Sequence, residues 1–195
     1  MVNSILKFGS FSVALLLLSS STLGAEEDEA LPILLDAESS SFDQKTQTVV
    51  FQGLQITQGD MAIRADEAVA SGLDFQRSEW RFNGNVDISV GSVNILASSA
   101  ELVFEDHILV VADLRGNPAE FEDLSESREQ PIRGSANLLS YHSDDNTLRM
   151  TEGARLSEGS NNITGCDLIY DLEEEKLTSG TSECGTPLVI TIIPP

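Results

Sequence analysis

The sequence predicts an all-β protein whose elongated body is built from repeated bent hairpins, and three observations support this. One piece recurs four times with the same internal offsets, glycines return at nearly constant spacing, and apolar and polar side chains alternate between those glycines. Alternation with a period of two is typical of strands with one buried face. Helical patterning is absent after residue 25. A folded-over sandwich and a β-solenoid both satisfy these observations.

The first repeated piece begins with isoleucine, has a small residue two positions later, and has apolar or small positions five, seven and nine residues later. The offset of five breaks the alternation and moves the next side chain to the other face. The small residue before it leaves room for a bulge or corner, so we expect each strand to bend between two sheets. The copies are Ile63, Ala65, Ala68, Ala70; Ile95, Ala97, Ala100, Leu102, Phe104; Ile132, Gly134, Asn137, Leu139, Tyr141; and Ile163, Gly165, Leu168, Tyr170, Leu172.

The second repeated piece is a glycine that follows a large apolar residue by two or three positions. These glycines lie 31, 32 and 37 residues apart, and the longer last interval indicates an insertion around residues 122–130. The segment from Trp80 to Val90 shows the clearest alternation and predicts a half-buried strand. The pairs are Phe51 with Gly53, Phe82 with Gly84, Leu114 with Gly116, and Met150 with Gly153.

Turn-forming residues fall between the predicted strands. Gly59, Gly91 and Gly159 occupy equivalent positions, and each is followed by Asp or Ser, a combination that suits tight hairpins. At the opposite ends of the strands, polar stretches predict turns. These stretches are residues 74–79, 106–107, 143–146 and 173–176.

The first 25 residues have the pattern of a secretory signal peptide. Lys7 precedes the apolar run from Phe11 to Leu18, and a small-residue stretch ends at Gly24 and Ala25, where we expect cleavage. An uncleaved anchor helix is the alternative, although the uncharged stretch barely reaches the roughly 20 apolar residues that span a bilayer. We therefore expect a signal peptide at residues 1–25, an acidic linker at 26–35 and one β domain at 36–195.

The net charge and the small number of candidate catalytic side chains argue against several classes of function. The chain has 11 Lys or Arg against 32 Asp or Glu, and its net charge of -21 argues against binding to nucleic acid. His107 and His142 each lie beside Asp in a predicted turn, outside any recognisable catalytic or metal-ligand spacing. The acidic clusters lack the frame of a calcium loop. We expect no enzyme, no metal and no cofactor.

Two cysteines, Cys166 and Cys184, are candidates for a disulfide because an exported protein meets an oxidising environment. A hairpin between residues 167–172 and 177–183 would place them opposite one another at a spacing that a bridge can use. Two unpaired buried thiols are the alternative.

Three stretches resemble a known family. The sequence DAESSSFDQKTQTVVFQGLQITQGDMAIRAD, from Asp36 to Asp66, resembles the start of the OstA-like domain of lipopolysaccharide-transport proteins. GSNNITGCDLIYDLEEEKL, from Gly159, and PLVITIIPP, from Pro187, resemble its end. The resemblance implies an open, twisted antiparallel β-jellyroll whose hydrophobic interior carries lipid A acyl chains, and whose copies stack end to end across the periplasm.

The resemblance also implies which side chains line a lipid-binding groove. Alternating apolar residues in a β protein ordinarily fill a closed core, so only the resemblance favours a groove here. Small residues such as Ala65, Ala68 and Ala100 predict an under-filled interior at one end. The expected lining is Ile63, Phe82, Val86, Ile88, Ile95, Leu102, Phe104, Leu139, Tyr141, Ile163, Leu168 and Tyr170.

The resemblance finally implies partners and a location. We expect a periplasmic subunit that binds lipopolysaccharide and joins other jellyroll subunits of a transport bridge at the inner and outer membranes. Sheet edges near Val49 to Thr57 and Leu188 to Ile193 predict head-to-tail self-association by strand addition. The alternatives are the membrane-anchored partner of the same pathway and a β-solenoid adhesin or scaffold with no ligand.

Overall fold

The computed structural model describes residues 31–72, 76–126, 129–174, 176–179 and 188–193, and it confirms the all-β prediction. Within these ranges every regular element is a strand. The strands are β1 (Leu34–Asp36), β2 (Ser39–Asp43), β3 (Thr48–Gln58), β4 (Met61–Ser71), β5 (Arg77–Val90), β6 (Val93–Glu105), β7 (Ile108–Asp123), β8 (Ile132–His142), β9 (Thr147–Glu158), β10 (Asn161–Asp171), β11 (Lys176–Ser179) and β12 (Val189–Thr191).

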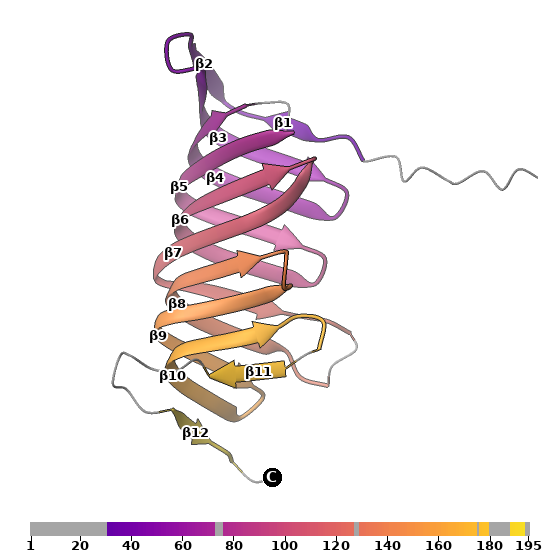
Figure 1. The fold of residues 1–195 in the computed structure, drawn as a ribbon, viewed down its shortest axis with the longest axis vertical. Coiled ribbons are helices and arrows are strands. Elements are labelled where there is room, and N and C mark those ends of the chain that lie inside the picture. Colours follow the sequence, from indigo (N-terminus) through magenta and orange to yellow (C-terminus); the bar gives the residue numbers. More distant parts are fainter. Residues whose placement is uncertain (1–30, 73–75, 127–128, 175, 180–187, 194–195) are drawn as a thin grey trace, which may run out of the picture.

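These strands form one open antiparallel sheet. The long strands β3 to β10 pair in sequence order, each with the strand before and the strand after it. They stack like rungs along the long axis of the molecule, and each rung bends back over the interior (Figure 1). Each pairing therefore joins strands that lie close in the sequence, as the repeated hairpins predict.

A line of irregularities crosses the sheet where the first repeat changes its step. The register shifts between Arg64 and Glu67 on β4 and between Gly165 and Asp167 on β10. Beyond each shift the strand pairs again with the same neighbour. The prediction of a bend is confirmed, but the two halves of each strand belong to one folded sheet and not to two separate sheets.

The glycines of the second repeat lie on this line. Gly84 has a φ of +74°, a conformation that side chains with a Cβ rarely adopt. A Cβ at Gly84 would also overlap the Asp66 carboxylate, and Asp66 accepts a hydrogen bond of 2.8 Å from Asn85 Nδ2. Glycine is therefore needed here both for the backbone angle and for the close approach of β4.

The third repeat departs from the predicted pattern by one residue. Ala136 is buried and Asn137 is exposed, whereas the offset of five placed Asn137 inside. The reason is a large bulge in β7, where the three residues after Arg115 lie opposite Asn137 alone before pairing resumes at Ala119 with Ala136.

Most of the predicted turns are confirmed, but the one at residues 74–79 is wrong in its second half, because Arg77 to Glu79 already belong to β5. Gly59, Gly91 and Gly159 have φ values of +58°, +55° and +57°, and each opens a two-residue turn, the arrangement of a type II′ hairpin. At the opposite side, Asp106 and His107 both have positive φ and form the β6–β7 turn. The insertion is the longer connection that follows Asp123 and precedes Ile132.

Both ends of the sheet are capped by two short strands. At one end, β2 pairs with the first half of β3 and β1 pairs with its second half. At the other end, β12 covers residues 162–164 of β10 and β11 covers residues 168–171. The prediction of a free edge at Val49 to Thr57 is therefore wrong, because β1 and β2 occupy it. The segment near Leu188 to Ile193 does lie at an edge, as β12.

The segments ahead of the sheet are described only in part. The predicted signal peptide at residues 1–25 lies outside the described residues, as does half of the predicted acidic linker, residues 26–30. The sheet begins at Leu34, and Ile33 and Leu35 pack against the core. No helix in the part of the chain that the structure describes has the length and hydrophobicity to cross a membrane.

Candidate functional site

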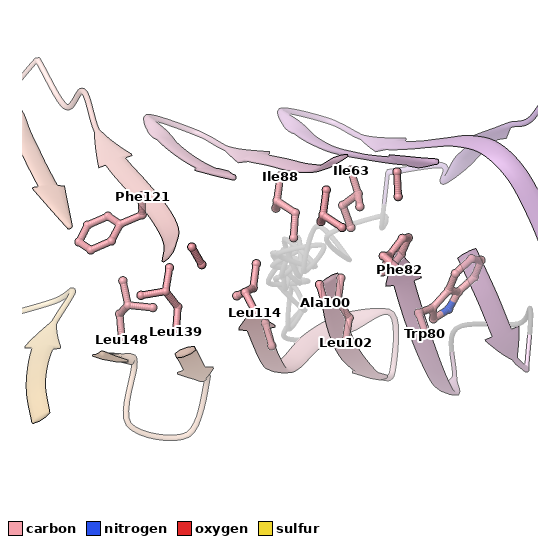
Figure 2. Packing of buried hydrophobic residues seen from close by; sticks show 14 of the residues in the cluster. Ile63, Trp80, Phe82, Ile88, Ala100, Leu102, Leu114, Phe121, Leu139 and Leu148 are labelled. Atoms are coloured by element: carbon pink, nitrogen blue, oxygen red, sulfur yellow. The ribbon is translucent and has the colours of Figure 1, made fainter. Parts of the chain in front are cut away.

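The apolar interior enclosed by the folded sheet is the candidate site. Figure 2 shows Ile63 and Ile88 pointing from one half of the sheet toward Phe82, Ala100, Leu102 and Leu114 on the other half. The strand halves on either side of the bulge line alternate buried and exposed residues, so both present an apolar face to this space.

All twelve residues predicted to line a groove contribute to this interior. Nine of them are buried, and Ile95, Tyr141 and Ile163 are partly buried and pack against the same cluster. The buried nine are Ile63, Phe82, Val86, Ile88, Leu102, Phe104, Leu139, Leu168 and Tyr170. The sequence therefore identifies which side chains face inward, although lipid binding by them stays a prediction.

Side chains fill most of this interior. The nine buried residues are 0–3% exposed and form one continuous cluster that runs from β3 to β10. Over most of its length the described interior is thus a packed core. A groove that is open from end to end, as the resemblance implies, is not present in the described residues.

Aromatic rings stack in the interior at the end formed by β3 to β6. The ring of Trp80 stacks on Phe51 with centroids 5.9 Å apart and on Phe82 with centroids 5.8 Å apart. The interplanar angles are 11° and 12°. Trp80 is 1% exposed, and its indole Nε1 donates a 3.1 Å hydrogen bond to Ser78 Oγ, which satisfies the buried polar atom.

The small residues at this end do not leave it under-filled, so that prediction is wrong. Ala68 and Ala100 are the register partners of Phe82 on either side, and Ala70 is a partner of Trp80. All three alanines are 0–2% exposed. They are small because a neighbouring ring occupies the volume that a larger side chain would need.

Open space lies instead at the opposite end, in a cavity of about 400 Å³ between β8 and β12. We call it the end chamber. Ile163 and Tyr170 belong to the predicted lining, and polar residues at positions 157, 158 and 161 also border it. Its other apolar walls were not predicted from the sequence; they are Ile132, Leu156, Leu177, Ile190 and Ile192.

Two of these missed residues had a signal in the sequence. Ile132 opens the third repeat, and Leu156 continues the alternation that starts at Leu148 on β9. Ile190 and Ile192 carry no such signal, because they reach the chamber only through the pairing of β12 with β10.

The outer face of the sheet is polar and mainly acidic. A second hollow of about 360 Å³ crosses β6 to β10 there, with an ion pair between Arg133 and Glu122 among its walls. Farther along, Arg149 donates from Nε to Asp167 Oδ1 at 2.8 Å and from Nη2 to Oδ2 at 2.5 Å. The hydrogen bonds to Asp167 and its charge raise the pKa of Arg149.

The residues considered for chemistry remain apart. His107 lies in the β6–β7 turn and His142 ends β8. The described residues contain no group of three or more His, Cys, Asp or Glu side chains that could hold a metal ion. Cys166 is not a free thiol, while Cys184 lies outside the described residues, so their pairing stays a prediction.

Curated relatives of the chain are lipopolysaccharide export proteins. The chain is 25% identical over 130 residues to the lipopolysaccharide export system protein LptA of Escherichia coli strain K12, covering 66% of this chain and 69% of the relative. It is 23% identical over 186 residues to LptA of Haemophilus influenzae, covering 95% of this chain and 90% of the relative.

The fold also matches a crystal structure of LptH from Pseudomonas aeruginosa, described as the LptA-homologous periplasmic component of the conserved lipopolysaccharide transport device. The TM-score is 0.54 at 16% identity, and the match covers 84% of this chain and 96% of LptH. This likeness supports the open, twisted antiparallel β-jellyroll.

A family model places the chain more firmly than any single relative. The model of the LptA and LptD N-terminal domain lipopolysaccharide transport proteins matches residues 67–176, which run from β4 to the start of β11. These residues include the bulge line and most of the apolar interior. The chain belongs to this family of lipopolysaccharide transport proteins.

Proposed function

We propose that this protein is a periplasmic transport subunit that shields the acyl chains of lipopolysaccharide in its apolar interior and bridges the inner and outer membranes. The observation that carries the proposal is the continuous apolar cluster that runs along the sheet and opens into the end chamber. Membership of the lipopolysaccharide transport family supports this ligand over other lipids.

The energetics of transport favour such an interior. Each methylene group kept out of water contributes about 0.8 kcal/mol, so a chain of a dozen carbons needs roughly 10 kcal/mol of continuous shielding. The inward-facing residues are almost all hydrocarbon, and they extend from Phe51 on β3 to Tyr170 on β10. A chain that moves along this path exchanges one apolar contact for another.

Loading requires the two halves of the sheet to separate, because side chains fill most of the space between them. The strand pairings join neighbours along the sheet, and none of those described runs across the interior. Separation therefore displaces side chains and leaves the sheet hydrogen bonds intact. An acyl chain that enters replaces the lost contacts with its own.

Phosphorylated head groups would remain outside. The net charge of -21 and the acidic outer face repel phosphate, so affinity comes from the chains. The head group of the lipid thus stays in water, while the apolar interior holds the acyl chains.

A bridge between two membranes also requires protein partners. The proposal places the mature chain in the periplasm after removal of the signal peptide, in contact with other jellyroll subunits and with further copies of itself. Supporting this, the β12 end is rich in exposed apolar side chains, with Ile192 71% exposed and Ile193 56% exposed. The membrane-anchored partner of the pathway shares the fold, and N-terminal sequencing of the mature protein distinguishes the two.

A scaffold with no ligand is the second candidate, and the tight packing around Trp80 favours it. Native mass spectrometry after expression in a lipopolysaccharide-producing host separates the candidates, because a carrier retains lipid and a scaffold does not. Leu139→Asp, on the inner face, should abolish retention, since a carboxylate there is costly to desolvate.

Leu138→Asp is the matched control, because Leu138 is the next residue on β8 and faces outward. It should retain the lipid. Circular dichroism first establishes that both variants are folded. A folded Leu139→Asp protein that carries as much lipid as the parent contradicts the proposed lining.

A further inference from the structure

A hollow of about 360 Å³ crosses β6 to β10 on the outer face, and polar side chains form most of its walls. We call it the outer hollow. Its side chains lie in two register rows that run across the sheet, and cavities of about 300–1,000 Å³ are typical of small-molecule sites. One row contains Leu96, Glu120, Ser135 and Arg155, and the row beside it contains Glu122 and Arg133.

The outer hollow has a short side chain between two long ones. Ser135 is the register partner of Glu120 on one side and of Arg155 on the other. The backbones that carry this carboxylate and this guanidinium are thus two strand spacings apart, roughly 10 Å. The hydroxyl group of Ser135 fills little of that interval. The row therefore leaves space for a ring between an acceptor and a donor.

Several polar groups in the outer hollow have no partner within the protein. Glu122 and Arg133 form an ion pair, and the Arg133 carbonyl accepts a hydrogen bond of 3.5 Å from Ser157 Oγ. Other polar side chains of the hollow make no hydrogen bond or ion pair with any residue that the structure describes. Among them are Glu120, Ser135 and Arg155. Their donors and acceptors are therefore available to a ligand.

The charges in the outer hollow balance, which favours a neutral ligand. Glu120 and Glu122 are opposed by Arg133 and Arg155, so the four formal charges cancel. An anion such as phosphate gains little from two arginines that have two carboxylates beside them. A carboxylate accepts and a guanidinium donates two hydrogen bonds in parallel, which matches the neighbouring hydroxyl groups of a sugar. Leu96 is 53% exposed and offers an apolar contact to the C–H face of a sugar ring.

The outer hollow and the end chamber share a wall. Leu156 and Ser157 line both cavities. The next residue, Glu158, borders the chamber at the β9–β10 turn, as does Asn161 on the far side of that turn. A polar border thus connects the apolar chamber with the outer face. A molecule with an apolar part in the chamber can place a polar part in the hollow by passing around this turn.

We propose that the outer hollow binds neutral sugar units. Glu120 and Arg155 bind the hydroxyl groups from opposite sides, and Ser135 leaves the space between them for the ring. The source of the sugars rests on the proposed function: they belong to the head group of a lipopolysaccharide whose acyl chains lie in the interior. The hollow lies on the outer face, so a sugar bound there stays in contact with water.

Nuclear magnetic resonance of the mature protein tests this site. The probes are maltose, lactose and N,N′-diacetylchitobiose, three neutral disaccharides, with inorganic phosphate as the charged comparison. At least one disaccharide should shift the backbone amide signals of Ser135 and Arg155 to saturation. Phosphate should leave them in place. The signals of Val50 and Val69, which lie at the other end of the sheet, should not move with any probe.

Two variants connect the shifts to named side chains. Arg155→Gln should weaken binding of the disaccharide roughly tenfold, because it removes a charged donor. Ser135→Leu should abolish binding by filling the interval between Glu120 and Arg155. Arg64→Gln is the matched control, since Arg64 lies in the same register row on β4, outside the hollow, and it should leave the affinity unchanged.

Three results would overturn the sugar site. One is the absence of saturable shifts with all three disaccharides. Another is a shift of the same signals by phosphate as large as that by the sugar, since the hollow would then be an anion site. The third is an equal loss of affinity in the Arg155→Gln and Arg64→Gln proteins.

A second comparison identifies the source of the sugars. Protein loaded with lipopolysaccharide should show the disaccharide shifts at Ser135 and Arg155, and protein loaded with stearic acid should not. The same shifts with stearic acid would contradict the head group as their cause. The sugar site and the transport function also fail separately. Lipid retention without disaccharide binding removes only the sugar site, whereas disaccharide binding by a protein that retains no lipid removes only the transport function.

Discussion

The ring of Phe121 on β7 lies directly against Gly134 on β8. The two residues are register partners, and a Cβ added at Gly134 would overlap the Phe121 ring. This is why the third copy of the repeat has glycine where the first two have alanine. In Figure 2 the ring of Phe121 points away from the other labelled side chains, along the sheet.

Gly134→Ala should therefore destabilise the fold. The added methyl group forces the Phe121 ring to move within a packed interior, at a cost of about 1–3 kcal/mol. Urea denaturation measures this as a lower midpoint at an unchanged slope. Adding Phe121→Leu should recover part of the loss, because it removes the ring that the methyl group meets. Additive effects of the two changes would argue against a direct clash.

Arg149→Gln should lower the free energy of unfolding by about 0.5–1 kcal/mol, the range for a well-formed ion pair at a surface. Arg64→Gln is the control, because Arg64 Nη1 lies 3.9 Å from Asp87 Oδ2 and both side chains are substantially exposed. We expect almost no change from it. Equal effects of the two substitutions in denaturant titrations would show that the two-bond geometry at Asp167 contributes nothing.

The ion pair between Arg149 and Asp167 also predicts how the free energy of unfolding depends on pH. Because the hydrogen bonds and charge of Asp167 raise the pKa of Arg149 in the folded protein, the stabilisation is fully present below the pKa that the arginine has in the unfolded chain. It is lost only as the pH rises through the higher folded pKa. The difference in unfolding free energy between the parent and Arg149→Gln should thus persist through mildly alkaline conditions, which denaturant titrations at several pH values can verify.

Ile163→Asp should abolish lipid retention by placing a carboxylate in the end chamber. Ile163 is only partly buried, so its replacement is less damaging to the fold than one in the packed centre. Asn162→Asp adds the same charge to the neighbouring outward position and should leave retention unchanged. Native mass spectrometry compares the two. Loss of lipid from both would point to a general effect of charge.

The β6–β7 turn offers a stabilising change. Asp106 and His107 both have positive φ, which Asn followed by Gly adopts with less strain. The double replacement Asp106→Asn and His107→Gly should raise the unfolding free energy by about 0.5–1 kcal/mol. Asp60→Gly in the β3–β4 turn should bring no gain, because Asp60 is not among the residues with positive φ. Thermal denaturation compares the two proteins.

A bridge between Cys166 and Cys184 would stabilise the β10 end. Cys166→Ser should lower the unfolding free energy by about 2–4 kcal/mol under oxidising conditions. Under reducing conditions the parent and the variant should unfold alike. Thiol labelling of the unfolded parent should detect free cysteines only after reduction. Labelling without reductant would rule out the bridge.

The sequence predicted the parts of the fold that depend on local rules. The alternation from Trp80 to Ile88, the glycines at turns and the steps of the repeat all act through backbone geometry within a few residues, and the structure confirms them. Val90, which the alternation also placed on the buried face, is exposed at the end of β5. The inward-facing residues follow from the same alternation. Only the third repeat differs, because a bulge on β7 shifts which residue of β8 points inward.

What the sequence did not predict depends on contacts between strands. From the sequence, the small side chains of Ala68 and Ala100 predict unfilled volume. In the structure the ring of Phe82 lies between them. The end chamber likewise needs Ile190, which reaches it from a strand of three residues. The caps on β3 and β10 come from short strands too brief for a periodic signal.

The short strands at the two ends of the sheet limit how further strands can add to it. The backbone groups of Asn162 to Thr164 on the outer side of β10 are already engaged by β12, and β1 and β2 engage those of β3. An additional strand that pairs with these residues of β3 or β10 first has to displace the short strand that is already paired there. A strand that pairs instead with β1, β2, β11 or β12 meets a partner of only three to five residues, so any filament that forms without displacing these strands would have short, weak joints.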